Sequence, residues 1–355
     1  MVEKSTQIGL FFILKQSLFE SQNCYKSWRM KAKIIGTGCY LPKKVLSNQD
    51  LEKMVDTTDE WITTRTGMKE RRMASAEEHT SVMGYEAALK ALIEAKISAQ
   101  EVDLILFATI TPDYTFPSSA CLVQKMLGAV NAAALDIQAA CSGYVYALSI
   151  AKAYVESKLY KNVLVIASEK LSSIINYEDR STAILFGDGA ASCVVSCSGQ
   201  GLSIDHVTLG SDGEHACLLM LPAGGTRNPA TSETVAAKQH YLAMDGKDVF
   251  KHAVRRMEQA ALQSLEKAGL SENDVDYLIP HQANIRIIEA IAKRFKLPME
   301  KVYLTIHKYG NTSASSVGIA LDEFVREKKL EHNQHILLTA FGAGLTWGAC
   351  VLTTD

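Results

Sequence analysis

AALKALIEAKISAQEVDLILFATITP (residues 87–112) and AALQSLEKAGLSENDVDYLIPHQAN (residues 260–284) align without a gap. Both stretches begin with paired alanines, carry leucines at Leu92 and Leu265, and have a Val-Asp pair before an apolar run. Each has the pattern of an amphipathic helix, a turn and a buried strand. The repeat predicts a chain folded as two related α/β halves.

A second pair of stretches strengthens this prediction. AYVESKLYKNVLVIASEK (residues 153–170) resembles EFVREKKLEHNQHILLTAFGAG (residues 323–344), again as helix, turn and strand. Two matches in the same order indicate largely parallel or mixed sheets covered by helices on both sides. We expect an N-terminal half at residues 30–200 and a C-terminal half at residues 201–355.

Residues 1–29 differ in character from the rest of the chain. Their apolar run, IGLFFILKQSLF, is far too short to span a membrane, and no good cleavage site for a signal peptide comes after it. From Met30 the sequence changes to KAKIIGTGCYLP, a β-rich opening with turn glycines. We expect residues 1–29 to be an N-terminal extension outside the fold.

Composition limits the classes of function. The 355 residues are 47% hydrophobic and 21% charged, which is globular usage. The net charge of −2 argues against nucleic acid or an acidic membrane surface as the main partner. Eight cysteines are scattered without a C-x-x-C pair. This pattern predicts a reducing cytoplasm, mostly free thiols and no metal site.

Three polar residues stand at the ends of predicted elements. Cys141, in LDIQAACSGYVYALSIAKAYV, lies where an apolar strand gives way to a helix. The following helix favours an anion there, so we expect more thiolate than in a free cysteine, as a nucleophile requires. His281 in IPHQANIRII and Asn311 in KYGNTSASSVGIAL could converge on it. The structural alternatives are a small buried cysteine, a helix-capping histidine and a turn asparagine.

The ordered motifs AACSG, PHQAN, GNTSAS and FGAGLTWG resemble the β-ketoacyl-[acyl-carrier-protein] synthase III family of the thiolase-like superfamily. The similarity runs from about Met30 to the C-terminus. It implies a five-layer αβαβα fold of two duplicated halves, and a homodimer. Asn311 replaces the second histidine of the chain-elongating synthases, and FGAGLTWG lacks the second cysteine of thiolases. It also lacks the proline that chalcone-type synthases carry in this loop.

The resemblance implies a decarboxylative condensation that initiates type II fatty-acid synthesis. An acyl-CoA primer, by default acetyl-CoA, acylates Cys141. Malonyl-acyl carrier protein then gives acetoacetyl-carrier protein, carbon dioxide and coenzyme A. His281 and Asn311 stabilise the charge formed on decarboxylation, and the backbone N–H groups of Cys141 and Ala343 hold the acyl oxygen. Coenzyme A thioester is a substrate, and no cofactor or metal is implied.

Further residues are matched through the same resemblance. Trp61 and Arg65 lie in DEWITTRTGMKERR, and the family places the adenine of coenzyme A between Trp61 and Arg180 with Arg65 nearby. Phe116 matches a residue that reaches the acyl pocket of the partner subunit and limits primer length. Asn284 matches a position that helps to order the site around His281.

The helix expected after PHQAN has one basic face. Arg286, Lys293 and Arg294 fall together at i, i+7 and i+8, while its apolar residues share the opposite face: Ile287, Ile288, Ile291 and Phe295. An ordinary solvated helix would look the same. The family docks acidic acyl carrier protein on the matching basic residues, with Lys251 nearby.

Other classes of function remain open at this point. A related Cys-His-Asn condensing enzyme could use another primer. A papain-like cysteine protease also has Cys, His and Asn in this order, with His about 130–150 residues after Cys, although its C-G-[SA]-C-[WY] signature is absent here. A non-catalytic thiolase-like binding subunit would be expected to lose the nucleophile, and Cys141 is present.

Overall fold

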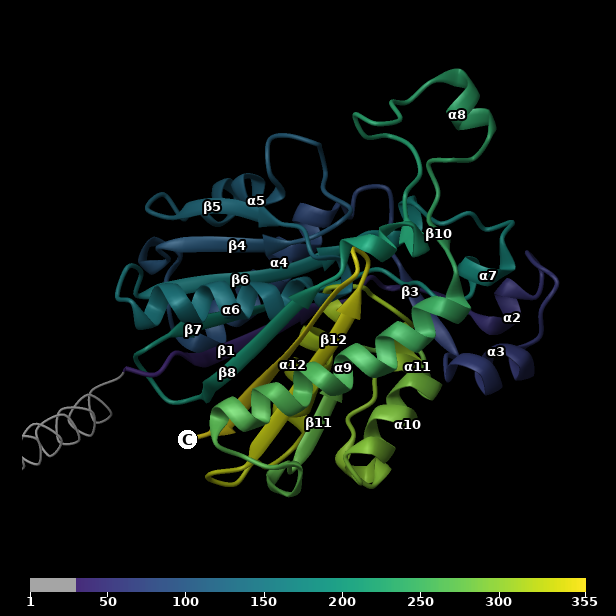
Figure 1. Ribbon diagram of the computed structural model, residues 1–355. Helices are drawn as coiled ribbons and strands as arrows, with labels where there is room; N and C mark the ends of the chain where they lie inside the picture. The colour runs from purple at the N-terminus through teal and green to yellow at the C-terminus, as the bar shows by residue number, and fades with distance from the viewer. Residues whose placement is uncertain (1–29) are drawn as a thin grey trace, which may run out of the picture. The chain divides into compact units, whose positions relative to one another are not determined.

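The computed structural model describes residues 30–355, and the predicted extension at 1–29 lies outside the described residues. Between Ala32 and Asp355 the chain forms one compact unit around a nine-stranded sheet in the order β11-β12-β13-β8-β1-β7-β6-β4-β5 (Figure 1). The strands of the first half are β1 (Lys33–Tyr40), β4 (Leu104–Ala108), β5 (Ala133–Ile137), β6 (Asn162–Glu169) and β7 (Gly189–Ser196). Those of the second are β8 (Leu202–Ser211), β11 (Tyr277–Pro280), β12 (His335–Gly342) and β13 (Thr346–Thr354).

The two halves repeat one topology, as the sequence predicts. In the first, β4 and β6 pair in parallel and β7 lies antiparallel between β6 and β1. In the second, β11 and β12 pair in parallel and β13 lies antiparallel between β12 and β8. Only the pairs Lys33↔Ser203 and Ile34↔Leu202 join β1 to β8. The sheet is therefore two mixed half-sheets that meet along a short seam.

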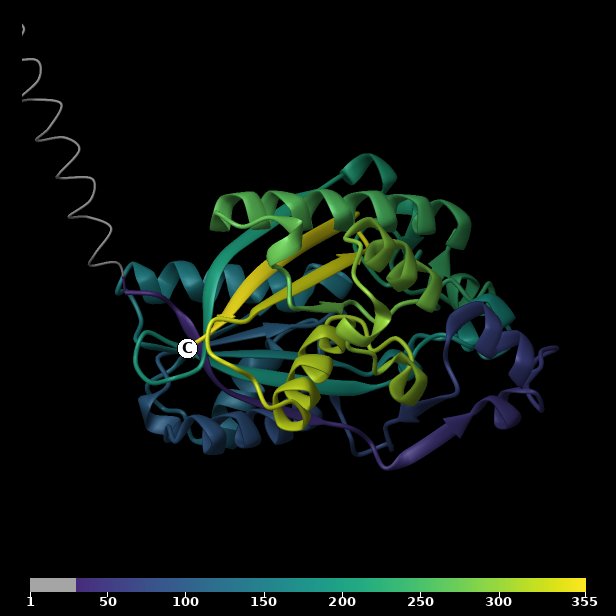
Figure 2. The same ribbon diagram turned by 90° about the horizontal axis from the view of Figure 1, so that it is seen from below.

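Helices complete the five layers. Two of them, α4 (Thr80–Ala95) and α5 (Ser119–Leu127), pack on the first half-sheet, and α9 (Gly246–Ala268) packs on the second beside α10 (Ile285–Arg294). Figure 2 shows the blue helix α4 and the green helix α9 on opposite outer sides. The helices α6 (Gly143–Glu156) and α12 (Ser315–Glu327) contact each other and strands of both half-sheets, so they form the middle layer.

Small residues allow the middle helices to pack closely. A Cβ atom on Gly318 of α12 would lie 2.6 Å from the Cβ of Ala191 in β7 and 3.0 Å from the Tyr144 ring in α6. A Cβ on Gly143 would lie 3.0 Å from that of Ala108 in β4. Helix α12 is buried along most of its length, which explains why its sequence lacks a clear polar face.

The predicted division at residues 200 and 201 falls in the turn between β7 and β8. We keep it as our proposed boundary because the topology repeats on either side of it. The N-terminal half also carries the antiparallel pair β2 (Lys44–Ser47) and β3 (Glu70–Met73) and the helix α3 (Asp59–Thr66). The C-terminal half extends a long excursion that carries the short helix α8 (Ser232–Ala236) away from the sheet (Figure 1).

Within residues 30–355 no helix is both long and apolar enough to cross a bilayer. The cysteines of this part of the chain are all free: Cys39, Cys121, Cys141, Cys193, Cys197, Cys217 and Cys350. This agrees with the expectation of mostly free thiols.

The close contact of α4 with β1 generates the first prediction. A Cβ on Gly36 would lie 2.5 Å from the backbone N of Ala95 and 2.6 Å from the carbonyl O of Ala91. Because backbone atoms cannot rotate away, Gly36→Ala should push α4 outward at a cost of about 1–3 kcal/mol and lower the melting temperature. Gly213→Ala is the control, since nothing lies within 4 Å of its added Cβ. Equal melting temperatures for the two variants, measured by circular dichroism, would contradict the packing.

Candidate active site

Cys141 lies in a single 3₁₀ turn, Ala140–Ser142, between β5 and the start of α6. This is the predicted strand-to-helix turn. The residue is only 7% exposed. The end of β12 packs against it, because a Cβ on Gly342 would lie 2.5 Å from the backbone N of Cys141. Both halves of the chain therefore fix the position of the thiol.

His281 follows the last residue of β11 and is 3% exposed. Its backbone N–H donates to the carbonyl O of Thr339, 2.8 Å away, which ties it to β12. Its ring Nδ1 lies 2.6 Å from the hydroxyl of Ser316, and that hydroxyl also accepts from the backbone N–H of Gln282 at 3.4 Å. We assign the Ser316 hydroxyl as donor to Nδ1, which leaves the proton of the neutral ring on Nε2.

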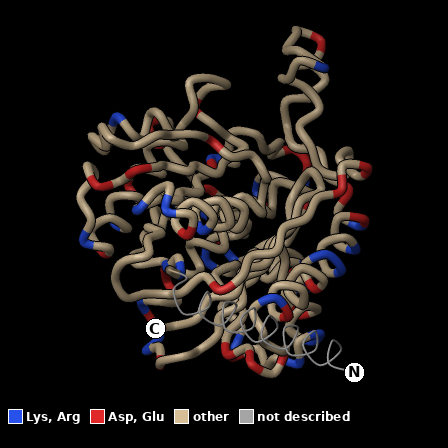
Figure 3. The backbone as a smooth tube through the Cα atoms, turned by 60° about the vertical axis from the view of Figure 1, so that its left-hand side comes forward, with Lys and Arg blue, Asp and Glu red and all other residues tan. Residues whose placement is uncertain are grey.

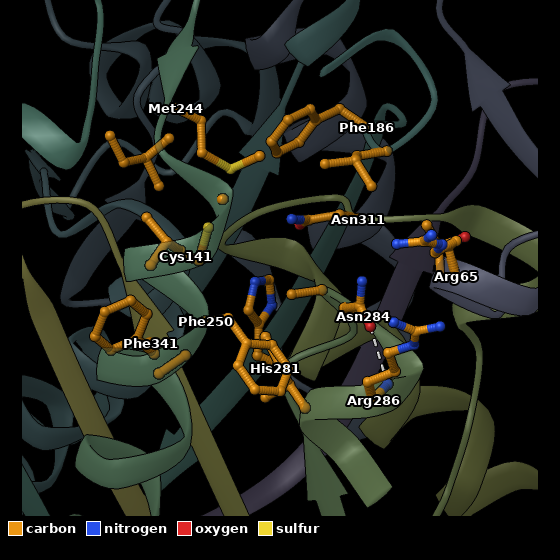
Figure 4. Close-up of a pocket in the computed structure, with 18 of the residues that line it drawn as sticks. Arg65, Cys141, Phe186, Met244, Phe250, His281, Asn284, Arg286, Asn311 and Phe341 are labelled. Carbon is orange, nitrogen blue, oxygen red and sulfur yellow. Dashed lines mark hydrogen bonds between the residues drawn. The ribbon is translucent and has the colours of Figure 1, made fainter. Parts of the chain in front are cut away.

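Asn311 lies in the loop between α11 (Ile306–Tyr309) and α12. Its Oδ1 accepts from the backbone N–H of Ser313 at 2.8 Å, and its backbone N–H donates to the carbonyl O of Leu185 at 2.9 Å. Since Oδ1 is held in this way, the side-chain NH₂ group remains as a donor. Figure 4 shows Cys141, His281 and Asn311 pointing into one cavity, as the sequence predicts.

Burial dominates the ionisation of two of these groups. It raises the pKa of the Cys141 thiol to about 12, although a hydrogen bond from Ser313 acts to lower it. This direction is opposite to the expected enrichment of thiolate, because desolvation of the buried thiol is the largest influence on its pKa. Burial also lowers the pKa of His281 to about 3, so the imidazole is neutral at neutral pH.

Two cavities meet at Cys141. The larger, about 590 Å³, runs from Trp61 and Arg65 on α3 past Arg286 to the Cys141 thiol. The smaller, about 400 Å³, extends from Cys141 among mostly apolar residues of three segments: Ile110, Leu171, Ile174, Leu219, Leu221 and Leu242. A long substrate could thus lie in the first cavity while a short apolar group occupies the second.

The outer part of the larger cavity is aromatic and basic. The guanidinium carbon of Arg180 lies 5.0 Å from the centre of the Trp61 ring, and that of Arg65 lies 5.4 Å from it. Arg180 also donates to the carbonyl O of Asp56 at 2.9 Å. These three predicted residues are brought together, but Arg180 contacts Trp61 directly.

The other predicted residues are more dispersed. Ala343 lines the smaller cavity with Cys141. Asn284 lines the larger one, and its Oδ1 caps α10 by accepting from the backbone N–H of Arg286 at 2.9 Å. Phe116 is 85% exposed and lines neither cavity of its own chain.

The predicted basic residues lie on α10 and α9. The apolar face of α10 is buried as predicted, and Arg286, Lys293 and Arg294 are exposed. Arg294 forms an ion pair with Glu258 of α9 at 2.5 Å, and Lys251 forms one with Asp248 at 2.7 Å. Acidic and basic residues alternate over the molecule as a whole (Figure 3).

Sequence patterns did not reveal three side chains around this site: Ser316 beside His281, and Ser313 with Glu169 behind Cys141. The sequence could have pointed to Glu169, since a charged residue at the end of the largely apolar strand β6 is unusual. The two serines had no such signal, because GNTSASS contains several and only the fold shows which face the site.

Comparison with known proteins identifies relatives along most of the chain. Residues 135–213 match the profile of 3-oxoacyl-[acyl-carrier-protein (ACP)] synthase III, and residues 265–354 match that of its C-terminal part. The β-ketoacyl-[acyl-carrier-protein] synthase III of Chlamydia muridarum is 59% identical over 324 residues, covering 91% of this chain and 99% of that protein. The enzyme of the same name from Caldanaerobacter subterraneus is 53% identical over 91% of this chain and 98% of its own length.

Solved structures of proteins with the same family name are also similar to this chain. The crystal structure of 3-oxoacyl-[acyl-carrier-protein] synthase III from Aquifex aeolicus is similar with a TM-score of 0.83 and 51% identity, covering 91% of this chain and 99% of that one. The enzyme from Thermus thermophilus has the same TM-score at 43% identity. These neighbours support the thiolase-like five-layer fold.

The buried neutral His281 generates a prediction about pH. Its pKa in the folded protein, about 3, lies below the ordinary 6.5, so between these values the unfolded chain binds more protons. Stability from this residue is present above pH 6.5 and is lost as the pH falls toward 3, by up to about 1.4 kcal/mol per pH unit. His281→Gln should lose less stability than the wild type between about pH 6.5 and pH 4.5. Parallel melting curves for the two proteins over this range would refute the prediction.

Proposed function

Because the chain belongs to the 3-oxoacyl-[acyl-carrier-protein] synthase III family, we propose that Cys141, His281 and Asn311 carry out its condensation at the meeting point of the two cavities. The chain is a condensing acyltransferase of fatty-acid synthesis. The observation that carries the assignment of the site is the position of Cys141, the one side chain of the three that lines both cavities.

In the first half-reaction the sulfur of Cys141 attacks the carbonyl carbon of an acyl-CoA. The product is again a thioester, so the transfer is close to neutral in free energy, and coenzyme A leaves. The developing oxyanion would be held by the backbone N–H groups of Cys141 and Ala343, which flank the close contact between Gly342 and the nucleophile turn.

In the second half-reaction malonyl-acyl carrier protein loses carbon dioxide, and negative charge develops on its thioester oxygen. The Nε2–H of His281 and the side-chain NH₂ of Asn311 supply donors for that oxygen. Their other polar atoms are already engaged with Ser316 and Ser313, so little reorganisation is needed as the charge develops. The carbanion then attacks the acyl group on Cys141 and releases the 3-oxoacyl product.

We propose that acyl-CoA enters by the larger cavity with its adenine at Trp61. An aromatic ring with two guanidinium groups suits a purine and its phosphates. In this structure Arg180 contacts Trp61 directly, so the adenine would separate them by displacing the guanidinium. Coenzyme A is then a substrate, and the reaction as written balances without a metal or cofactor.

Acetyl-CoA is our proposed primer, with a branched or longer acyl group as the alternative. The smaller cavity receives the acyl chain, and each methylene there changes the preference by about 1–3 kcal/mol. The exposure of Phe116 supports a role at the acyl pocket of a partner subunit in a homodimer. We further propose a cytoplasmic location, in keeping with the free thiols and the negative net charge.

The alternative of a papain-like protease is wrong, since both the family and the fold are those of a thiolase-like synthase. A condensing enzyme of the same family with another primer remains the alternative to acetyl-CoA.

The first test separates the two half-reactions. Cys141→Ala should form no acyl adduct with acetyl-CoA, whereas His281→Ala and Asn311→Ala should form one and fail to condense it, because their donors act on the malonyl oxygen. Intact mass measures the adduct, and release of 3-oxoacyl-carrier protein measures condensation. Cys193→Ala is a matched control, since that buried cysteine lies in β7 and lines neither cavity. A stable adduct on Cys141→Ala would sink the assignment.

We propose that acyl carrier protein docks on the basic side of α10. Arg286 reaches the wall of the larger cavity, and Lys293 is exposed two turns farther along the helix. Arg294 and Lys251 are paired with Glu258 and Asp248, so their charges are partly neutralised. Arg286 and Lys293 therefore carry the larger share of the attraction to an acidic partner.

The second test uses Arg286→Glu combined with Lys293→Glu. We expect KM for malonyl-carrier protein to rise about tenfold or more at low salt, and the effect to shrink as ionic strength increases. Lys293→Glu alone should leave acylation by acetyl-CoA nearly unchanged, because Lys293 lines neither cavity, whereas Arg286 lies on the proposed path of coenzyme A as well. Lys125→Glu with Lys161→Glu, an exposed pair on the N-terminal half, is the control of equal charge change. Equal losses in both half-reactions would point to damage at the site instead of docking.

A further inference from the structure

A buried carboxylate lies behind the nucleophile. Glu169 ends β6 and is 0% exposed. Its Oε2 accepts from the hydroxyls of Thr111 at 2.7 Å and Thr109 at 3.1 Å, and from the backbone N–H of Ile110 at 3.1 Å. Its Oε1 accepts from the hydroxyl of Ser313 at 3.1 Å. So many donors around one carboxylate hold its orientation and stabilise its charged form.

Ser313 joins this carboxylate to Cys141. Its hydroxyl donates to the Glu169 carboxylate at 3.1 Å, and Ser313 lines the smaller cavity together with Cys141, where it acts to lower the pKa of the thiol. A hydroxyl has only one hydrogen, so it can donate to one of the two groups at a time. Ser313 is also held in a left-handed conformation with φ of 51°, where its backbone N–H donates to Asn311. The backbone thus fixes the hydroxyl between the two groups.

The acylation step needs an acceptor for the thiol proton. Burial raises the pKa of Cys141 to about 12, which favours the protonated thiol at neutral pH. His281 is a poor acceptor, because burial lowers its pKa to about 3 and its Nδ1 is bonded to Ser316. Burial raises the pKa of Glu169 to about 7 against the effect of its donors, so this carboxylate can exchange a proton near neutrality.

We propose that Glu169, acting through the hydroxyl of Ser313, takes the proton of Cys141 during acylation and returns it after condensation. This inference rests on the proposed function, since it adds a proton path to that same site. In this path Ser313 exchanges the proton with the reacting sulfur, and Glu169 acts through Ser313.

The proton balance closes over one turnover. In acylation the S–H bond of Cys141 breaks, its proton passes to the Ser313 oxygen, and the Ser313 hydrogen passes to Glu169. The sulfur forms the thioester, and the departing coenzyme A thiolate takes a proton from solvent. In condensation the carbanion attacks the acyl carbon and the Cys141 thiolate departs. It regains a proton from Glu169 through Ser313, and the enzyme returns to its starting state.

The other charged groups around β6 are engaged elsewhere. The ammonium group of Lys170 donates to the carbonyl O of Ser75, Asp188 accepts from Ser172 and Ala74, and Asp113 accepts from Ser81. Among the described residues, Cys141 is the ionisable group on which the charge of Glu169 acts directly within the site. The charge of Glu169 raises the pKa of Cys141, so a proton taken up by Glu169 favours the thiolate.

The experiment measures the rate of acylation by acetyl-CoA as a function of pH, by rapid quench and intact mass. The wild type should lose rate as the pH falls through about 7. Glu169→Gln should lower the neutral rate on the order of 10²–10³-fold, abolish this acid limb, and recover as hydroxide rises. Ser313→Gly should behave in the same way, since glycine accepts the left-handed backbone and only the hydroxyl is lost.

Two further variants keep the result decisive if Glu169→Gln is unstable. Thr111→Val removes a donor that lowers the pKa of Glu169, so the acid limb should move to higher pH while acylation persists. Asp136→Asn is the matched control: this carboxyl also has its pKa raised by burial and accepts backbone N–H groups, but it belongs to β5 and caps α5.

Two results would overturn the inference. One is a wild-type acid limb that survives in Glu169→Gln. The other is a rate loss in Glu169→Gln that is uniform at every pH, as a purely structural role would give. Absence of any acyl adduct in the wild type would overturn the proposed function itself, so the two failures are distinguishable.

Discussion

The site depends on the packing of α6 and α12 between the two half-sheets. One of these helices begins just after Cys141 and the other a few residues after Asn311, so their contact sets how far apart the proposed nucleophile and the proposed charge-stabilising amide lie. Gly318 permits that contact, because a Cβ there would lie 3.0 Å from the Tyr144 ring of α6, and Gly143 lets α6 approach β4. The packing of the buried core and the geometry of the proposed site therefore depend on the same contacts between helices.

Burial also determines which form each group takes. Removing water favours the neutral forms of the thiol and of the imidazole, which opposes the preference of a helix N-terminus for a thiolate. A neutral imidazole is well suited to donate a hydrogen bond without carrying charge, whereas a neutral thiol is a weak nucleophile. The same low dielectric that strengthens the donors therefore creates a need for proton transfer, which the proposed path through Ser313 to Glu169 would meet.

Sequence patterns within single segments were sufficient to predict much of the fold. The repeated helix, turn and strand predicted the duplicated topology, and the periodicity of α10 predicted its buried isoleucines. Other features arise only from the assembled structure. Arg180 meets Trp61 and Arg294 meets Glu258 across long stretches of chain, and no local pattern encodes either contact. The expected thiolate failed for the same reason, since desolvation of Cys141 depends on all the elements around it.

The meeting of the two cavities at Cys141 and Phe186 has a kinetic consequence. If the smaller cavity holds the acyl group, both thioester substrates must approach the sulfur through the larger one. The first carrier must then depart before the second can bind, which is substituted-enzyme kinetics with a covalent intermediate. Acyl-CoA and malonyl-acyl carrier protein also compete for the free enzyme in this cavity, so a large excess of the second should slow formation of the acyl-enzyme.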